Sequence, residues 1–233
     1  IINEVVTKGL NPNVEMKGSG VEWIGEIPDG WLSIPLKYFL EKNKDSIRTG
    51  PFGSTLKSSD MIESGIRIYN QRTVYDEDFS SGEIFVSDEK YQTMKSFTVL
   101  NGDILISSRG TIGKMTIVPE GSDIGVLHPC LIRLRIDQKK MNKQFLWWYM
   151  NHSSLFLQSV KFESNSTTID VIYSNVLSEV KFPVPTIIEQ EEIVSFLSQK
   201  IGVVDKTVSI EEKRIELLKE YRQSLISEVV TGK

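Results

Sequence analysis

Residues 189–230 read EQEEIVSFLSQKIGVVDKTVSIEEKRIELLKEYRQSLISEVV, and this stretch decides how the chain is built. It contains no proline and a single glycine, Gly202, so no strong helix breaker interrupts it. At 1.5 Å per residue, a helix of this length extends over about 60 Å. We therefore predict one long α-helix for residues 189–230.

Apolar side chains recur along this predicted helix at alternating spacings of four and three residues. The pattern is broken only at Glu211 and Arg222. Such spacing is typical of a coiled coil, in which a second helix covers the apolar stripe. A helix that lies on its own domain is the alternative, but the length of the stripe favours a partner helix. The predicted helix-pairing residues are Leu197, Ile201, Val204, Val208, Ile215, Leu218, Leu225 and Val229.

Upstream of the helix, the sequence changes to a mixed α/β pattern. Short apolar or β-branched runs at 66–69, 103–108, 115–118 and 131–136 predict strands. Aromatic and aliphatic residues at helical spacing predict a helix over 143–160, and we interpret these aromatics as core. The predicted fold class is therefore α+β: a globular mixed α/β domain, residues 32–186, followed by a long coiled-coil-forming α-helix, residues 187–233.

The two ends of the chain resemble each other. Residues 1–7 (IINEVVT) and residues 225–231 (LISEVVT) are identical at five of seven positions. A match this short can arise by chance, but a tandemly repeated protein cut one repeat long leaves this arrangement. We therefore expect the chain to be a piece of a longer polypeptide. Residues 1–31 are then the end of a preceding helix and a linker rich in Gly, Pro and Asn.

Composition limits the possible classes of protein. The chain has 39% hydrophobic and 25% charged residues, and no apolar run approaches the roughly 20 residues needed to cross a bilayer. A single cysteine, Cys130, excludes an internal disulfide and fits a reducing cytoplasm. The net charge of −4 disfavours a strong unaided grip on DNA. A DNA-binding role therefore requires clustered basic groups or partners that share the phosphate contacts.

The motifs of the common enzymes of nucleic acids are missing. Two Gly-rich basic stretches, 50–58 and 109–114, lack the spacing of a phosphate-binding loop. The nearest match to the D/N-P-P-aromatic loop of base-amino methyltransferases, residues 11–13, lacks the second proline and the aromatic. The acidic and basic residues at 88–90 are adjacent, so on an extended chain they point to opposite faces. We therefore predict no catalytic site, no metal ion and no cofactor.

Strings along the whole chain, taken in order, resemble one known family. The chain is similar to the DNA-specificity subunit of type I restriction–modification enzymes, with one target-recognition domain and one conserved helical region. Each string alone is moderately specific, and the ordered set is highly specific. The strings are VEWIGEIPDGW (21–31), GPFGSTLK (50–57), GDILISSRGTIGK (102–114), LIRL (131–134), FPVPTIIEQ (182–190) and IELLKEYRQSLISEVVTGK (215–233).

The resemblance implies a non-catalytic recognition role in the cytoplasm, without a membrane. An intact subunit of this kind carries two recognition domains and two long helices that pair antiparallel. Each domain reads one half of a split double-stranded DNA target, and the helix pair sets the spacing between the halves. Methyltransferase subunits dock on it, and restriction subunits join through the complex. This chain matches one repeat, so its helix is expected to pair with a second specificity repeat or a second copy.

Candidate DNA-contacting residues follow from the types of side chain that reach bases and phosphates. Asn70, Gln71 and Arg72 follow a predicted strand and offer hydrogen-bonding groups for adenine or guanine edges. Gly-rich loops carry the candidates for phosphate contact, since glycine lets the backbone approach closely. These candidates are Lys57, Arg109 and Lys114, and the weaker ones are Ser166, Thr167 and Thr168.

Some alternatives remain open from the sequence alone. Arg133 and Arg135 share one face of a predicted strand and are either structural or DNA-facing. A different class of function, a coiled-coil scaffold or adaptor without direct DNA contact, explains the long helix and the acidic charge. It does not explain the terminal repeat together with a polar, Gly-rich domain. A stand-alone nuclease is disfavoured because no metal-binding pattern is present.

Overall fold

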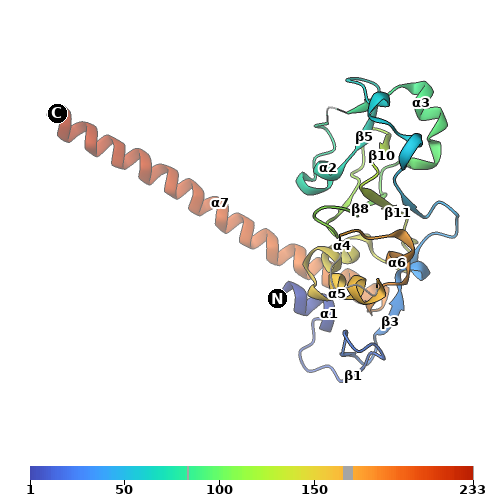
Figure 1. The fold of residues 1–233 in the computed structure, drawn as a ribbon. Helices are drawn as coiled ribbons and strands as arrows, with labels where there is room; N and C mark the ends of the chain where they lie inside the picture. The colour runs from blue at the N-terminus through green and yellow to red at the C-terminus, as the bar shows by residue number, and fades with distance from the viewer. Residues whose placement is uncertain (83, 165–169, 233) are drawn as a thin grey trace. The chain divides into compact units, whose positions relative to one another are not determined.

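The computed structural model describes residues 1–82, 84–164 and 170–232. The chain divides into two compact units, Ile1–Ile193 and Val194–Lys233. The first unit contains all the strands found in the described residues, and the second consists of the greater part of α7 (Ile187–Thr231). The predicted α+β class, with a mixed domain and one long helix, is confirmed (Figure 1).

The first unit contains two four-stranded sheets, whose labelled strands lie above α4, α5 and α6 in the view of Figure 1. In both sheets all strand pairs are antiparallel except β5–β10, which is parallel. One sheet has the order β6 (Phe85–Val86), β5 (Ile66–Tyr69), β10 (Gly125–Leu127) and β7 (Thr98–Val99). The other has the order β4 (Ile47–Thr49), β11 (Leu131–Leu134), β8 (Ile104–Ser107) and β9 (Met115–Ile117).

The two sheets share one hydrophobic core. The central strands β8 and β11 are buried at every position, which fits their almost continuous apolar sequence. The core cluster draws residues from both sheets and from α2 (Gln71–Asp76). Because the sheets are packed through one cluster, the loops at their strand ends are held in fixed relative positions. The cluster consists of Tyr69, Val74, Phe79, Val99, Leu105, Val118, Leu127 and Leu131.

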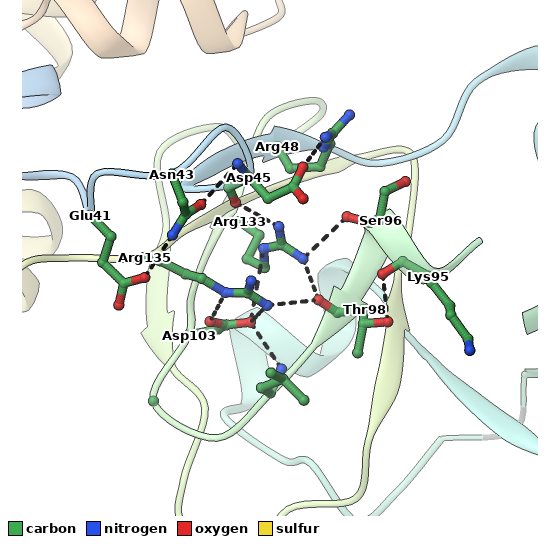
Figure 2. A network of polar contacts seen from close by, with 12 residues as sticks. Glu41, Asn43, Asp45, Arg48, Lys95, Ser96, Thr98, Asp103, Arg133 and Arg135 are labelled. Atoms are coloured by element: carbon green, nitrogen blue, oxygen red, sulfur yellow. Dashed lines mark hydrogen bonds and ion pairs between the residues drawn. The ribbon is translucent and has the colours of Figure 1, made fainter. Parts of the chain in front are cut away.

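A buried polar network also joins the two sheets (Figure 2). Arg133 of β11 is 1% exposed and donates to the carbonyl oxygens of Thr98 in β7 and of Asp45. Asp103, also buried, pairs with Arg133 and accepts from Arg135 Nε at 2.8 Å. Burial lowers the pKa of Arg133 to about 10, which leaves it charged at neutral pH. Arg133 is therefore a buried structural residue, and Arg135, whose side chain is 21% exposed, is paired with Asp103 in the same network.

Helices cover the other end of the first unit. The predicted helix 143–160 is in fact two helices, α4 (Lys143–His152) and α5 (Ser154–Glu163). Ser153 separates them because its backbone is extended and its hydroxyl accepts from the Leu155 amide at 3.1 Å, which caps α5. The interpretation of the aromatics as core is confirmed, since Phe145, Trp148, Tyr149 and Phe156 are buried.

Shorter elements complete the unit. The helices are α1 (Ile2–Lys8), which packs on α4, α3 (Asp88–Thr93) and α6 (Ser174–Glu179). The 3-10 turns are η1 (Leu36–Phe39), η2 (Gly53–Thr55), η3 (Ser58–Asp60) and η4 (Lys95–Phe97). Two antiparallel pairs join β1 (Met16–Gly18) to β2 (Glu26–Pro28), and β3 (Leu32–Pro35) to β12 (Lys181–Val184).

Residues 8–31 are more regular than a linker. The Gly-, Pro- and Asn-rich composition of this segment favours irregular structure, but β1 and β2 form a small antiparallel hairpin here. Two tryptophans anchor the segment: Trp23 Nε1 donates to Ser159 Oγ at 2.9 Å, and Trp31 Nε1 donates to Glu189 Oε2 at 2.9 Å. The second contact ties the segment to the beginning of α7.

Candidate nucleic-acid interface

The loop that follows β8, residues 108–111, is the meeting point of several predicted DNA-contacting segments. The side-chain amide of Gln71, at the start of α2, donates to the Arg109 carbonyl oxygen. One turn further along α2, the Tyr75 hydroxyl donates to the Thr111 carbonyl oxygen at 2.6 Å. The structure therefore brings the strings 69–73 and 109–114 together, although they are separated by about 40 residues in sequence.

The conformation of the β8–β9 loop requires a serine at position 107 and glycines at positions 110 and 113. The Ser107 hydroxyl donates to the Thr111 carbonyl oxygen at 2.8 Å and accepts from the Lys114 amide at 3.0 Å. Gly110 and Gly113 have φ of 70° and 83°, a region that disfavours other residues. The loop is therefore closed by its own sequence and presents Arg109 from a defined backbone.

Arg109 contacts two further segments of the site. Its guanidinium lies over the ring of Phe52, 5.1 Å from the centroid, so the string 50–57 also reaches this loop. Its backbone forms an isolated antiparallel bridge with Val171, and the Ile172 amide donates to the Ser108 carbonyl oxygen at 2.8 Å. Ser166, Thr167 and Thr168 lie outside the described residues, and the chain that follows them returns to Arg109.

The three predicted base-contacting residues have different positions. Asn70 is the N-cap of α2, and its side-chain oxygen accepts from the amides of Arg72 and Thr73 at 2.9 and 3.3 Å. Gln71 is used to hold the Arg109 loop. The side chain of Arg72 is 85% exposed, and its Nε donates to Asp76 Oδ2 at 3.1 Å. The side chains of Asn70 and Gln71 therefore bind backbone groups of the domain, whereas Arg72 is exposed and paired only through Nε with Asp76.

The two predicted lysines do not contact Arg109 in the described residues. Lys57 is exposed next to η3, where its amide donates to Asp60 Oδ2 at 2.8 Å. Asp60 in turn pairs with Lys90 of α3 at 2.8 Å. Lys114, at the far end of the loop, lies near His152. Burial and the positive charge of Lys114 lower the pKa of His152.

Sequence reasoning missed Phe52 and Tyr75 as parts of this site. Phe52 is 49% exposed, which is unusual for so large an apolar side chain. Its position between two glycines, in Gly50-Pro-Phe-Gly53, was the available signal, because such a short string has no periodicity that explains an aromatic. Tyr75 lies four residues after Gln71, and this spacing places both side chains on one face of a helix.

The predicted helix-pairing residues of α7 differ in exposure. Leu197 is buried and Ile201 is half-buried, whereas Val204, Val208, Ile215, Leu218, Leu225 and Val229 are exposed by 42–83%. A second row of exposed apolar residues precedes the predicted row by one position at Val203, Ile210 and Leu217. The apolar stripe of the second unit is therefore wider than a single a/d seam.

Other kinds of site are not found in the part of the chain that the structure describes. No group of three or more His, Cys, Asp or Glu side chains there is arranged to hold a metal ion. None of the described helices combines the length and the apolar character needed to span a membrane.

Comparison with known proteins gives a consistent result. The chain is 24% identical, over its whole length, to the type I restriction enzyme MjaVIII specificity subunit of Methanocaldococcus jannaschii, of which it covers 52%. It is 23% identical to the EcoBI specificity subunit of Escherichia coli, with 94% of this chain and 42% of that protein covered. The chain thus spans about half the length of the relatives it matches.

Solved structures share the fold. A chain from a study of complex assembly and conformational transition in a type I R-M system superposes with a TM-score of 0.62 at 18% identity, covering 97% of this chain and 51% of that one. The HsdS subunit of Thermoanaerobacter tengcongensis superposes with a TM-score of 0.53 at 19% identity, covering 82% of this chain and 41% of that one.

A family model described as "Type I restriction modification DNA specificity domain" matches residues 50–220, which is well over half of the chain. The match includes the strings at 50–57, 69–73 and 109–114 and most of α7. The resemblance stated from the sequence is confirmed, and the chain belongs to the family of type I restriction–modification DNA specificity domains.

Proposed function

We propose that the first unit recognises one half of a bipartite DNA target within a type I restriction–modification complex. The observation that carries this proposal is the convergence of α2, the β8–β9 loop and the Phe52 loop around Arg109. Base recognition needs donors and acceptors held on a rigid frame. The frame here is fixed by side-chain hydrogen bonds to the backbone of the loop and by a shared core, and it presents the exposed side chain of Arg72.

Within this interface we assign a role to each side chain from its exposure and its hydrogen bonds. Arg72 faces solvent and is the candidate for a base contact, whereas Asn70 and Gln71 hold α2 and the loop in place. Arg109, Lys57 and Lys114 are proposed to contact phosphates, which position the domain without carrying sequence information directly. Ser166, Thr167 and Thr168 remain candidates for the same role.

For α7 we propose pairing with a like helix, from a second specificity repeat or a second copy of the chain. The exposed stripe of the second unit supports this, since large apolar side chains at this density favour a partner. The breadth of the stripe leaves room for more than one covering helix, and we propose that methyltransferase subunits dock here as well. Restriction subunits would join through the assembled complex.

We propose that the chain has no catalytic activity of its own and acts in the cytoplasm, where its DNA target is. Methylation and cleavage then belong to the partner subunits. The mildly acidic net charge of −4 fits a recognition subunit whose partners supply many of the phosphate contacts.

A coiled-coil scaffold without DNA contact is the second candidate, and the exposed stripe of α7 together with the negative net charge favours it. DNA mobility shifts with the full chain, with and without methyltransferase subunits, distinguish the two. Recognition predicts that the complex prefers one DNA sequence over scrambled DNA and that the preference changes when the recognition domain is changed. A complex whose preference is independent of this chain would support the scaffold.

A further inference from the structure

Arg72 is distinguished from the other arginines of the first unit by its exposure. Of the six arginines in that unit, all of them described, only Arg72 is exposed. Arg67 donates to the Gly82 carbonyl oxygen at 2.9 Å, and Arg48 pairs with Asp45. Arg109 lies over Phe52, and Arg133 and Arg135 belong to the buried network. Arg72 is therefore the arginine that is free to reach a base edge.

The platform beneath Arg72 is fixed on three sides. Asn70 caps the start of α2, and Val74 is fully buried in the core cluster. On the side of the β8–β9 loop, Gln71 and Tyr75 hold the carbonyl oxygens of residues 109 and 111. Because α2 is held in this way, the side chain of Arg72 projects from a backbone with a defined position. Recognition of a single base requires such a fixed starting point.

Asp76 determines which part of the guanidinium is available. It accepts from Nε of Arg72 at 3.1 Å, and Nη1 and Nη2 have no hydrogen-bond partner among the described residues. The ion pair thus holds the side of the guanidinium and leaves its terminal fork free. Two parallel N–H donors match the adjacent O6 and N7 acceptors of guanine in the major groove. Adenine presents N7 beside an amino donor, which opposes one of the two N–H groups.

We propose that Arg72, oriented by Asp76, recognises the guanine of one G·C pair in the half-site. This inference rests on the proposed function of the first unit and adds the identity of one base pair. Asp76 acts as a positioning residue: it also places a negative charge near DNA, so it weakens general attraction while improving discrimination. A surface ion pair that only stabilised α2 would contribute little to the domain and would have no effect on base preference.

The test uses the full chain assembled with methyltransferase subunits and a library of randomised DNA targets, sequenced after methylation. For wild type we expect a half-site containing a G·C pair. Arg72→Ala should lose the preference at that pair by roughly 10- to 100-fold and leave the other positions unchanged. Arg72→Lys should also lose it, because a single ammonium cannot form the fork.

Asp76→Ala is the diagnostic variant. It should reduce discrimination at the same G·C pair while binding to non-target DNA stays equal or becomes tighter, because a negative charge has been removed. The matched control is Glu89→Ala, which removes an exposed carboxylate of α3 that makes no ion pair with Arg72. It should leave every base preference unchanged. Unchanged thermal midpoints confirm that the variants are folded.

Two results would overturn these assignments, and they are distinguishable. If wild type shows a clear half-site but Arg72→Ala leaves it intact or relaxes an A·T pair, the guanine assignment is wrong and the proposed function stands. If the wild-type complex shows no sequence preference that depends on this chain, the proposed function itself is wrong.

Discussion

The two units of the chain place their apolar side chains in opposite environments. In the first unit, Leu105, Leu127 and Leu131 are fully buried in a core shared by two sheets. In the second, side chains of similar size such as Leu218 and Val229 are 59% and 83% exposed. The first unit therefore buries its large apolar side chains within its own fold and presents polar loops. The second unit exposes an apolar stripe, which we propose is covered by a partner helix. This difference is the physical basis for assigning recognition to one unit and assembly to the other.

The largest effect is expected from a change inside the first unit. Asp103→Asn removes the charge partner of the buried Arg133, and loss of one partner from a buried pair costs about 3–5 kcal/mol. All four tryptophans lie before residue 193, so urea unfolding followed by tryptophan fluorescence reports on the first unit alone. Asp45→Asn, which changes a half-exposed member of the same network, is the matched control and should cost much less (Figure 2).

The next effect belongs to the second unit. Leu218→Asp should weaken helix pairing by about 1.5–3 kcal/mol, because a leucine side chain can no longer be buried at the partner surface. Sedimentation of the assembled complex measures this, and the tryptophan-monitored unfolding of the first unit should stay unchanged. Ser209→Asp changes an exposed residue about half a turn around the helix from Leu218, on the side away from both apolar rows, and is the control. Equal loss of assembly in both variants would contradict the pairing surface.

A smaller effect separates phosphate contacts from base contacts. Arg109→Ala should weaken binding of the complex to target and non-target DNA by a similar factor. The slope of the logarithm of the binding constant against the logarithm of the salt concentration should become shallower by about 0.9. Lys206→Ala, an exposed lysine of the second unit, should change neither quantity. A loss confined to the target sequence would show that Arg109 contacts a base.

The smallest expected effect is a dependence of stability on pH that only the first unit shows. Burial lowers the pKa of His128, whose Nδ1 accepts from the Cys130 amide at 3.2 Å and must be unprotonated to do so. The folded state therefore binds this proton less readily than the unfolded state. The contribution of neutral His128 to the free energy of unfolding is fully present above about pH 6.5. It is lost as the pH drops below that value, by at most about 1.4 kcal/mol per pH unit. Thermal unfolding of wild type and His128→Gln between pH 7.5 and 5.5 checks this; equal slopes would contradict it.

Local features of the fold could be predicted from the sequence, and long-range ones could not. Periodicity is a local signal, so the long helix and the strands 66–69, 103–108, 115–118 and 131–136 were found close to their positions. The break between α4 and α5 could not be predicted because no Gly or Pro marks it. It is made by Ser153, whose hydroxyl caps α5.

The candidate site was predicted as separate strings and not as an arrangement. The types of residue at Gln71 and Arg109 suggested DNA contact, but only the folded chain shows that the Gln71 side chain reaches the Arg109 carbonyl oxygen. Whether a polar side chain is free to contact DNA also depends on its surroundings in the folded chain. Asn70 and Arg72 are two residues apart, and one is used as a helix cap while the other faces solvent.

The central claim is that residues 32–186 read DNA while α7 governs assembly and spacing. The most direct measurement is methylation mapping of the complex after residues 32–186 have been exchanged for the same region of a relative. We predict a new sequence in one half-site, an unchanged sequence in the other half, an unchanged gap between them and normal assembly. A complex that keeps its original half-site would show that residues 32–186 do not determine the DNA sequence that is recognised.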